Sequence, residues 1–272
     1  MTGRGIAVAA VVLTLAGAPA WAGLMQVSQG TADTTSQASF ISSGNLGHMV
    51  TGDFVARNDY SFQFGYGSKD VSDGSDLAAV RNAFSTWIDL PSSSLSAAEA
   101  AARGIRSLGQ ADGRNQITWV SADRFGTNAW TDKLGFEPYV IAAAVTWYYP
   151  NTGKVAERDI YFNDINMSWR TETDPAPAGA FSVEHIALHE IGHIYGLLDV
   201  YNPGQSGHVA WMGTGNESLT MYGYARWYDD GTTLSPEDIY AMALAHPAFP
   251  EPASVLLLAV GAVALRRCRI SR

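Results

Sequence analysis

Cysteine is almost absent from this 272-residue sequence, since Cys268 is the only one and lies close to the C-terminal end. A framework of disulfides is therefore excluded, although small exported domains often depend on one. The chain must instead be stabilised by its core, and a hydrophobic content of 47% is enough to form one.

Basic residues are also scarce, because 17 Lys and Arg stand against 26 Asp and Glu and leave a net charge of −9. An acidic chain repels nucleic acid and anionic membrane surfaces, so neither is an expected partner. The same charge is compatible with cation binding and with a soluble, exported surface.

The first 22 residues contain the parts of a secretory signal peptide. Arg4 precedes an apolar run over residues 6–18, and a small-residue A-x-A cleavage site ends at Ala22. The order of these parts predicts that residues 1–22 direct export and are then removed.

The C-terminal residues 249–272 combine a Pro-Glu-Pro triplet at 250–252, an apolar run over 253–265 and four arginines behind it. The run alone is shorter than the ~20 residues that a bilayer span needs. This arrangement resembles the PEP-CTERM sorting tails of Gram-negative bacteria. The resemblance implies transient anchoring in the membrane, processing by an exosortase-type enzyme, and a final location in the cell envelope, at the surface or outside the cell. A plain C-terminal anchor is the alternative.

The residues between these ends are interpreted as a leader or short pro-segment, 23–52, followed by one α/β-type domain, 53–248. Periodicity in the apolar residues separates the expected strands from the expected helices. Strands are expected at 60–67, 116–122, 139–149 and, at a sheet edge, 155–164; helices at 77–90, 181–198 and 234–247, capped by Asp76, Ser182 and Ser235; and a shorter helix or alanine-rich insertion at 96–108.

A metal-binding pattern lies on the helix expected at 181–198. His189 and His193 are four residues apart, so both imidazoles project from one helical face and can reach one zinc ion. Glu190 lies about 100° around the helix, at the edge of that face, where it can act as a general base on a metal-bound water. This H-E-x-x-H spacing is typical of zinc hydrolases.

The residues that follow extend the pattern to H-E-x-x-H-x-x-G-x-x-D. Gly196 can adopt the positive φ that ends a helix, after which Asp199 stands where a third ligand can approach the metal. The pattern resembles that of the metzincin metallopeptidases, whose third ligand is normally histidine, and aspartate occurs there in a minority of them. A carboxylate makes the bound zinc a weaker Lewis acid than a third imidazole does.

Further segments resemble the matrixin branch of the metzincins. SLTMYGYA at 218–225 resembles the Met-turn, with Met221 beneath the metal, and Tyr224 is a candidate for stabilising the oxyanion or lining the pocket. The resemblance implies a metzincin-like zincin domain: a mostly parallel twisted sheet, an active-site helix, the Met-turn and a C-terminal helix. It also implies that the strand near 157–163 holds an extended substrate and that residues after Met221 wall the pocket for the side chain following the cut.

Some alternatives for the metal sites remain open. His208 is the main rival to Asp199 as third ligand, whereas His185 is expected to bond the local backbone. Tyr161 stands where matrixins have a histidine for a second zinc, so one catalytic zinc is expected. A calcium ion at the acid-rich stretch 69–76 is a minor alternative, because the stretch lacks the twelve-residue calcium-loop pattern.

The predicted function is that of an exported, monomeric zinc endopeptidase acting on a protein or peptide substrate. One alternative is a non-catalytic surface or matrix protein that uses the same scaffold for binding. The other is a zinc hydrolase acting on amide bonds outside peptides, which the motif does not distinguish from a peptidase.

Overall fold

The computed structural model describes residues 59–105, 107–149, 154–174, 178–197, 199–200, 216–227 and 229–246, and short strands within residues 6–51. Apart from those short strands, the predicted signal peptide and leader lie outside the described residues. The predicted tail, 249–272, lies outside them entirely, as does His208. No helix in the described part of the chain is long and apolar enough to cross a bilayer.

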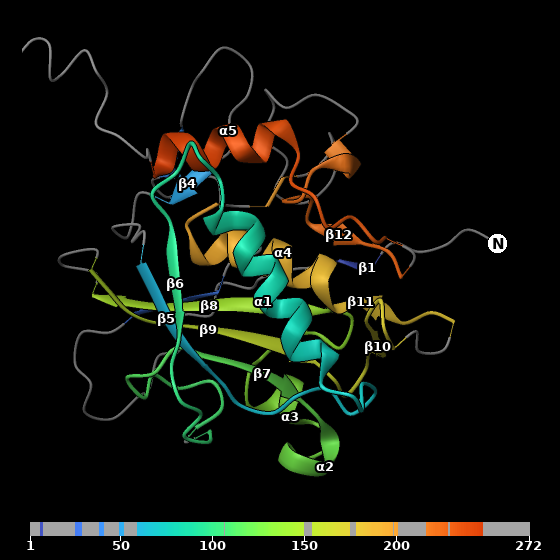
Figure 1. The fold of residues 1–272 in the computed structure, drawn as a ribbon. Helices are drawn as coiled ribbons and strands as arrows, with labels where there is room; N and C mark the ends of the chain where they lie inside the picture. Colours follow the sequence, from blue (N-terminus) through green and yellow to red (C-terminus); the bar gives the residue numbers. More distant parts are fainter. Residues whose placement is uncertain are drawn as a thin grey trace, which may run out of the picture.

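A six-stranded sheet forms the centre of the domain, in the strand order β2-β8-β9-β7-β5-β6 (Figure 1). The pairings β6-β5, β5-β7 and β7-β9 are parallel, whereas β9-β8 and β8-β2 are antiparallel. The predicted α/β class is therefore confirmed in general terms, with a mixed sheet in which parallel pairs predominate. The strands are β2 (Met25–Ser28), β5 (Asp59–Phe64), β6 (Ser96–Glu99), β7 (Gln116–Val120), β8 (Ala142–Tyr149) and β9 (Lys154–Asn163).

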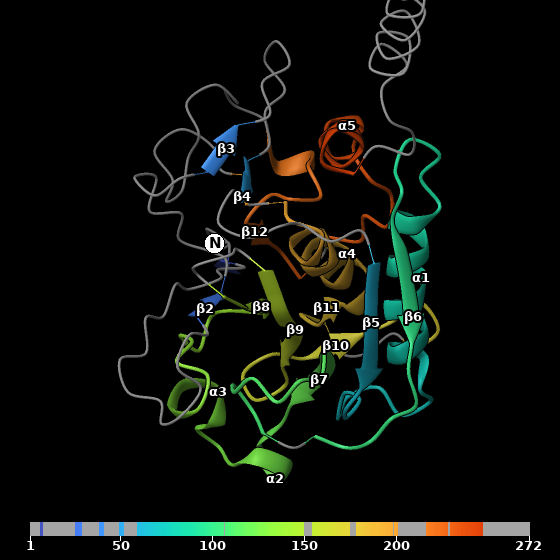
Figure 2. The ribbon, with the colours of Figure 1, turned by 90° about the vertical axis from the view of Figure 1, so that its left-hand side faces the viewer.

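Three longer helices lie on one side of the sheet: α1 (Ser75–Ile88), α4 (Val183–Ile194) and α5 (Pro236–Ala245). Figure 2 shows α4 over the sheet, α1 beside β5 and β6, and α5 farther from the sheet than α4. The indole of Trp87 on α1 donates a hydrogen bond of 2.8 Å to the carbonyl of Leu188 on α4. This bond and the shared hydrophobic core hold α4 against α1.

The residues of β8 alternate between two hydrophobic clusters, as the period of a strand requires. Ala142 and Ala144 belong to the core shared with α1 and α4. Ala143 and Val145 pack on the other face of the sheet with Trp130 of the short helix α3 (Ala129–Asp132). Both faces are therefore covered, which explains the nearly continuous apolar run at 139–149.

Strand β9 is not at an edge of the sheet, so the predicted edge position of 155–164 is wrong. Its Ile160 pairs with Ile117 of β7 on one side and with Ala144 of β8 on the other. β8 pairs with β9 along 157–162 and β7 pairs with it along 160–163, so β9 lies inside the sheet and does not present an edge for an extended substrate. Its charged residues suggested an edge, yet Glu157 is buried and accepts backbone N–H bonds from 112–114.

The segment 96–108 does not form the predicted helix. Ser96–Glu99 instead pairs in parallel with β5 and forms the edge strand β6. Alanine favours a helix, but a short exposed helix is only marginally stable by itself. Hydrogen bonds to β5 stabilise the strand instead. Gly104, with φ of 74°, then turns the chain away from the strand.

The helix caps agree with the sequence in two of three cases. Ser182 and Ser235 each accept a hydrogen bond from a backbone N–H three residues later. Asp76 is not a cap, because α1 begins one residue earlier, after Gly74 at φ 77°. The Asp76 carboxylate accepts instead from the backbone of Ser68 at 2.7 Å, which ties the start of α1 to the chain after β5.

The remaining elements are short. They are β1 (Ile6–Ala7) paired with β12 (Tyr224–Ala225), β3 (Ala38–Phe40) paired with β4 (Met49–Thr51), β10 (Trp169–Arg170) paired with β11 (Phe181–Ser182), the helix α2 (Ala122–Phe125) and the 3-10 turn η1 (Asn216–Ser218).

Candidate metal centre

The candidate metal centre lies at the C-terminal half of α4. His189 and His193 are one turn apart on the same buried face, with exposed fractions of 3% and 2%. Their imidazole rings meet edge to face, and their Nε2 atoms are 3.0 Å apart. Helical spacing therefore brings the two rings together as the motif predicted.

Each imidazole is oriented by a backbone carbonyl. His189 Nδ1 is 2.8 Å from the carbonyl oxygen of Thr220, and His193 Nδ1 is 2.8 Å from that of Leu197. A carbonyl oxygen only accepts, so both Nδ1 atoms carry protons and donate. In the neutral rings both Nε2 atoms are then unprotonated, with their lone pairs directed into the centre.

Asp199 approaches the two rings from beyond the helix. Gly196 has φ of 97°, and backbone bonds from Gly196 to His193 and from Leu197 to Gly192 close the helix end. Asp199 Oδ1 then lies 3.0 Å from His189 Nε2 and 3.3 Å from His193 Nε2. Burial acts to raise the pKa of Asp199, but when the two histidines are protonated they outweigh it and lower the pKa below its usual value.

Three ligand atoms thus converge on one point. Within the described residues, His189, His193 and Asp199 are the only such group close enough to hold a metal ion. Two bare nitrogens and a carboxylate oxygen at about 3 Å repel one another unless a cation lies among them. Two imidazoles and one carboxylate suit a zinc ion, and three protein ligands leave a fourth position open to substrate or water.

Glu190 lies beside this group without a hydrogen-bond partner for either carboxylate oxygen, although it is only 1% exposed. Burial raises the pKa of Glu190 to about 7; His189 partly offsets the rise, and Asp199 adds to it. A buried carboxyl with no partner is costly to fold and is commonly retained for chemistry. Its pKa suits a group that takes up and returns a proton near neutral pH.

Met221 lies in a tight turn beneath the helix. Tyr222 N–H donates to the carbonyl of Leu219, which places Thr220 and Met221 at the centre of the turn. Met221 is fully buried, and its backbone carbonyl accepts a hydrogen bond from Val200, one residue after Asp199. The turn therefore holds both the carbonyl that orients His189 and the segment that carries Asp199.

Helix α5 supports this turn through Asp238. Its carboxylate accepts from Thr220 N–H at 2.7 Å and from the Ser235 hydroxyl at 2.6 Å. The C-terminal helix thereby fixes the turn that positions His189. Sequence reasoning identified Ser235 as a cap but missed this role of Asp238, for which the sequence carries no signal.

Gly192 is a second residue that sequence reasoning missed. A Cβ atom at this position would overlap Met221 Sδ and would lie 3.3 Å from Trp87. Any side chain at position 192 would therefore require the Met221 side chain to move, whereas glycine lets the ligand helix approach the Met221 turn this closely. A glycine in the middle of a predicted helix is itself a signal of close approach, so the sequence held the clue.

The other predicted histidines and Tyr224 have separate places. His185 Nδ1 is 2.8 Å from the carbonyl of Gly231, so its partner is a backbone group as expected, but one in a distant loop and not in the local backbone. His246 is buried and donates to the carbonyl of Tyr195 at 2.7 Å. Tyr224 is half-buried, 5.8 Å between ring centroids from Tyr222, and lines a hollow that also includes His189.

Tyr161 fills its site by packing and hydrogen bonds. It is 1% exposed, donates to Asp159 at 2.5 Å and accepts from the backbone N–H of Gly109 at 3.2 Å. Burial raises its pKa well above the usual value, and the Asp159 charge adds to the rise. The phenol therefore stays protonated and provides no metal ligand.

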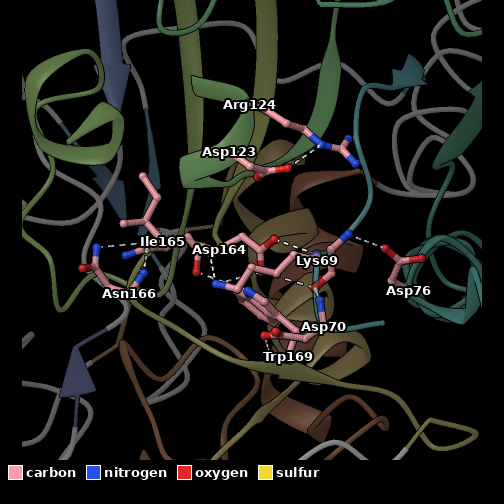
Figure 3. A network of polar contacts seen from close by, with 11 residues as sticks. Lys69, Asp70, Asp76, Asp123, Arg124, Asp164, Ile165, Asn166 and Trp169 are labelled. Carbon is pink, nitrogen blue, oxygen red and sulfur yellow. Dashed lines mark hydrogen bonds and ion pairs between the residues drawn. The ribbon is translucent and has the colours of Figure 1, made fainter. Parts of the chain in front are cut away.

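The acid-rich stretch 69–76 is engaged by the chain itself (Figure 3). Asp70 accepts from the backbone N–H of Trp169 at 3.1 Å. Asp164, at the end of β9, accepts from the backbone N–H of Lys69 at 2.7 Å, and Lys69 Nζ donates to the Asp164 carbonyl. These bonds join the chain after β5 to the chain after β9. Residues 69–76 are all described and gather no set of metal-ligating side chains.

Comparison with known families finds no family model that matches this chain, and comparison with curated proteins finds no match either. The function is therefore inferred from the residues of the centre and their geometry.

Proposed function

We propose that this protein is an exported zinc-dependent endopeptidase with a matrixin-like metzincin domain. The observation that carries the proposal is the convergence of His189, His193 and Asp199 beside the unpartnered carboxylate of Glu190. This combines a binding site for a Lewis acid with an acid–base group, which together suffice to hydrolyse an amide bond.

The donor set suits zinc better than the other common divalent ions. Two imidazole nitrogens favour zinc over magnesium and calcium, which prefer oxygen ligands throughout. When bound, zinc would polarise the substrate carbonyl and make water a better nucleophile near neutral pH. The second carboxylate, Glu190, remains outside the ligand group and is available for proton transfer.

Glu190 acts first as base and then as acid. A deprotonated carboxylate can take a proton from the attacking water, and the buried, neutral carboxyl then donates it to the leaving amine. Its raised pKa allows both forms near pH 7. The carbonyls of Thr220 and Leu197 meanwhile keep the two imidazoles in the tautomer that directs Nε2 at the metal.

The location and partners follow from the two ends of the chain. Export by residues 1–22 and processing of residues 249–272 by an exosortase-type enzyme place the monomeric domain in the envelope, at the surface or outside a Gram-negative cell. The substrate is a protein or peptide. Nucleic acid is not a partner, because the chain is acidic.

The test is to measure the zinc content of the purified protein and its hydrolysis of a peptide library. We expect close to one zinc per chain and peptide cleavage that a chelator abolishes and added zinc restores. Glu190→Ala should retain the metal and lose turnover by at least about a hundredfold, in line with the loss of a general base. A folded protein that binds no zinc and cleaves no peptide would contradict the proposal and favour the non-catalytic binding protein.

A further inference from the structure

A small hollow, partly open to solvent, lies beside the candidate metal centre. Its wall includes His189 from the ligand helix, Tyr222 and Tyr224 from the segment after Met221, and His185 one helical turn before His189. Because His189 is both a candidate ligand and part of the wall, a group bound in the hollow lies next to the metal. A substrate residue adjoining the scissile bond is therefore the part of the substrate that can reach it.

The charges on this wall have one sign. Glu217 and Asp229 both line the hollow, and among the described residues that form its wall there is no lysine or arginine. His185 does not offset them, because burial lowers its pKa and its Nδ1 proton is held by the carbonyl of Gly231. The hollow therefore has a negative potential that is favourable to a cationic side chain and unfavourable to an anionic one.

Asp229 is held in place by its own loop. Its Oδ2 accepts from the backbone N–H of Arg226 at 2.7 Å, and its backbone N–H donates to the carbonyl of Arg226 at 2.9 Å. The carboxylate is half-buried, whereas Glu217 is exposed at the wall. Asp229 is therefore the less exposed of the two charges, and the stronger contributor to selectivity.

We propose that this hollow binds a lysine or arginine side chain of the substrate, next to the bond that is cut, with Asp229 as the main determinant. The inference rests on the proposed peptidase function and names the class of peptide that the site prefers. The apolar part of the wall, Ile186 and Leu219, suits the aliphatic stem of such a side chain.

Matched peptides that differ at one residue test this preference. We would compare lysine, leucine and glutamate on either side of the cut bond and measure kcat/KM. We expect the lysine peptide to exceed leucine by about tenfold and glutamate by more, the scale of a partly buried charge pair. Asp229→Asn should remove most of this ratio, and Asp229→Lys should reverse it in favour of glutamate.

Asp230→Asn is the matched control, because Asp230 loses the same charge one residue away but does not line the hollow. This variant should keep the preference, since an exposed pair such as Asp230 with Arg170 contributes little. Glu217→Gln, at an exposed position, gives a second and smaller test if Asp229 variants do not fold. Equal cleavage of the lysine and leucine peptides, or an unchanged ratio in Asp229→Asn, would overturn the inference.

A binding measurement separates this inference from the peptidase proposal. In Glu190→Ala, which should not turn over, fluorescence anisotropy with labelled lysine and glutamate peptides reports binding alone. We expect tighter binding of the lysine peptide, weakened by salt and by Asp229→Asn. If the wild type cuts no peptide but lysine peptides still bind more tightly than glutamate peptides, the peptidase proposal fails and the charge preference of the hollow is supported. If peptides are cut and bound without regard to charge, only the inference about the hollow fails.

Discussion

Because Gly192 packs against Met221, we expect Gly192→Ala to destabilise the wild-type protein but to stabilise a variant that lacks the Met221 side chain. In a helix interior, Gly→Ala ordinarily stabilises by about 0.5–1 kcal/mol. At Gly192 the added methyl would overlap Met221 Sδ, lie 3.1 Å from Met221 Cε and 3.3 Å from Trp87. Overpacking of this kind costs about 1–3 kcal/mol. We therefore expect Gly192→Ala to lower the free energy of unfolding by about 1–2 kcal/mol.

The matched background is Met221→Ala, which removes the clashing side chain. That variant alone should cost about 2–5 kcal/mol, because it leaves a cavity beneath the helix. Adding Gly192→Ala to it should now stabilise the protein by up to about 1 kcal/mol, which gives a coupling free energy of about 1–3 kcal/mol.

Urea unfolding of the four proteins, with a chelator present throughout, measures this coupling without a contribution from bound metal. Equal effects of Gly192→Ala in both backgrounds would refute the reasoning, since they would mean that Met221 does not lie against Gly192.

Three further predictions concern the support of the domain. Burial raises the pKa of Glu157 to about 7, and Asp112 adds to the rise, whereas the ordinary value is 4.5. The folded state then holds this proton more tightly than the unfolded state, so stability falls as pH rises from about 4.5 to 7. Glu157→Gln should flatten that fall, by about 1–3 kcal/mol in urea unfolding at pH 5 and pH 8; an unchanged profile would contradict the assignment. Tyr161→Phe should cost about 1–3 kcal/mol, because Asp159 loses a donor, and a neutral effect in the same assay would count against that bond. Ser235→Ala should cost about 1 kcal/mol in thermal unfolding through the lost cap, and Ser235→Thr, which keeps the hydroxyl that donates to Asp238, should restore most of it.

The part of the candidate site that the sequence predicted is its local part. His189, Glu190 and His193 lie within five consecutive residues of one helix, so helical spacing alone determines their relation. Gly196 adds a positive φ and brings Asp199 to the same point only three residues later. Short-range geometry was therefore enough to predict these positions.

The errors come from long-range pairing. Whether 155–164 is an edge depends on β7 and β8, and β6 is a strand because β5 offers it a free edge more than thirty residues earlier in the chain. Asp76 has the sequence of a cap, but its carboxylate is taken by the backbone of Ser68 across a loop. None of these partners is visible in the local pattern, so propensity and periodicity gave the wrong answer.

The identity of the metal and of its third ligand tests the proposed centre most directly. Anomalous scattering from crystals of the purified protein, collected on both sides of the zinc absorption edge, shows the metal and its ligands together. We predict one peak at about 2.0–2.2 Å from His189 Nε2, His193 Nε2 and a carboxylate oxygen of Asp199. A zinc ion coordinated by His208 in place of Asp199 would contradict this account. So would crystals grown with added zinc that show no anomalous peak between the two histidines.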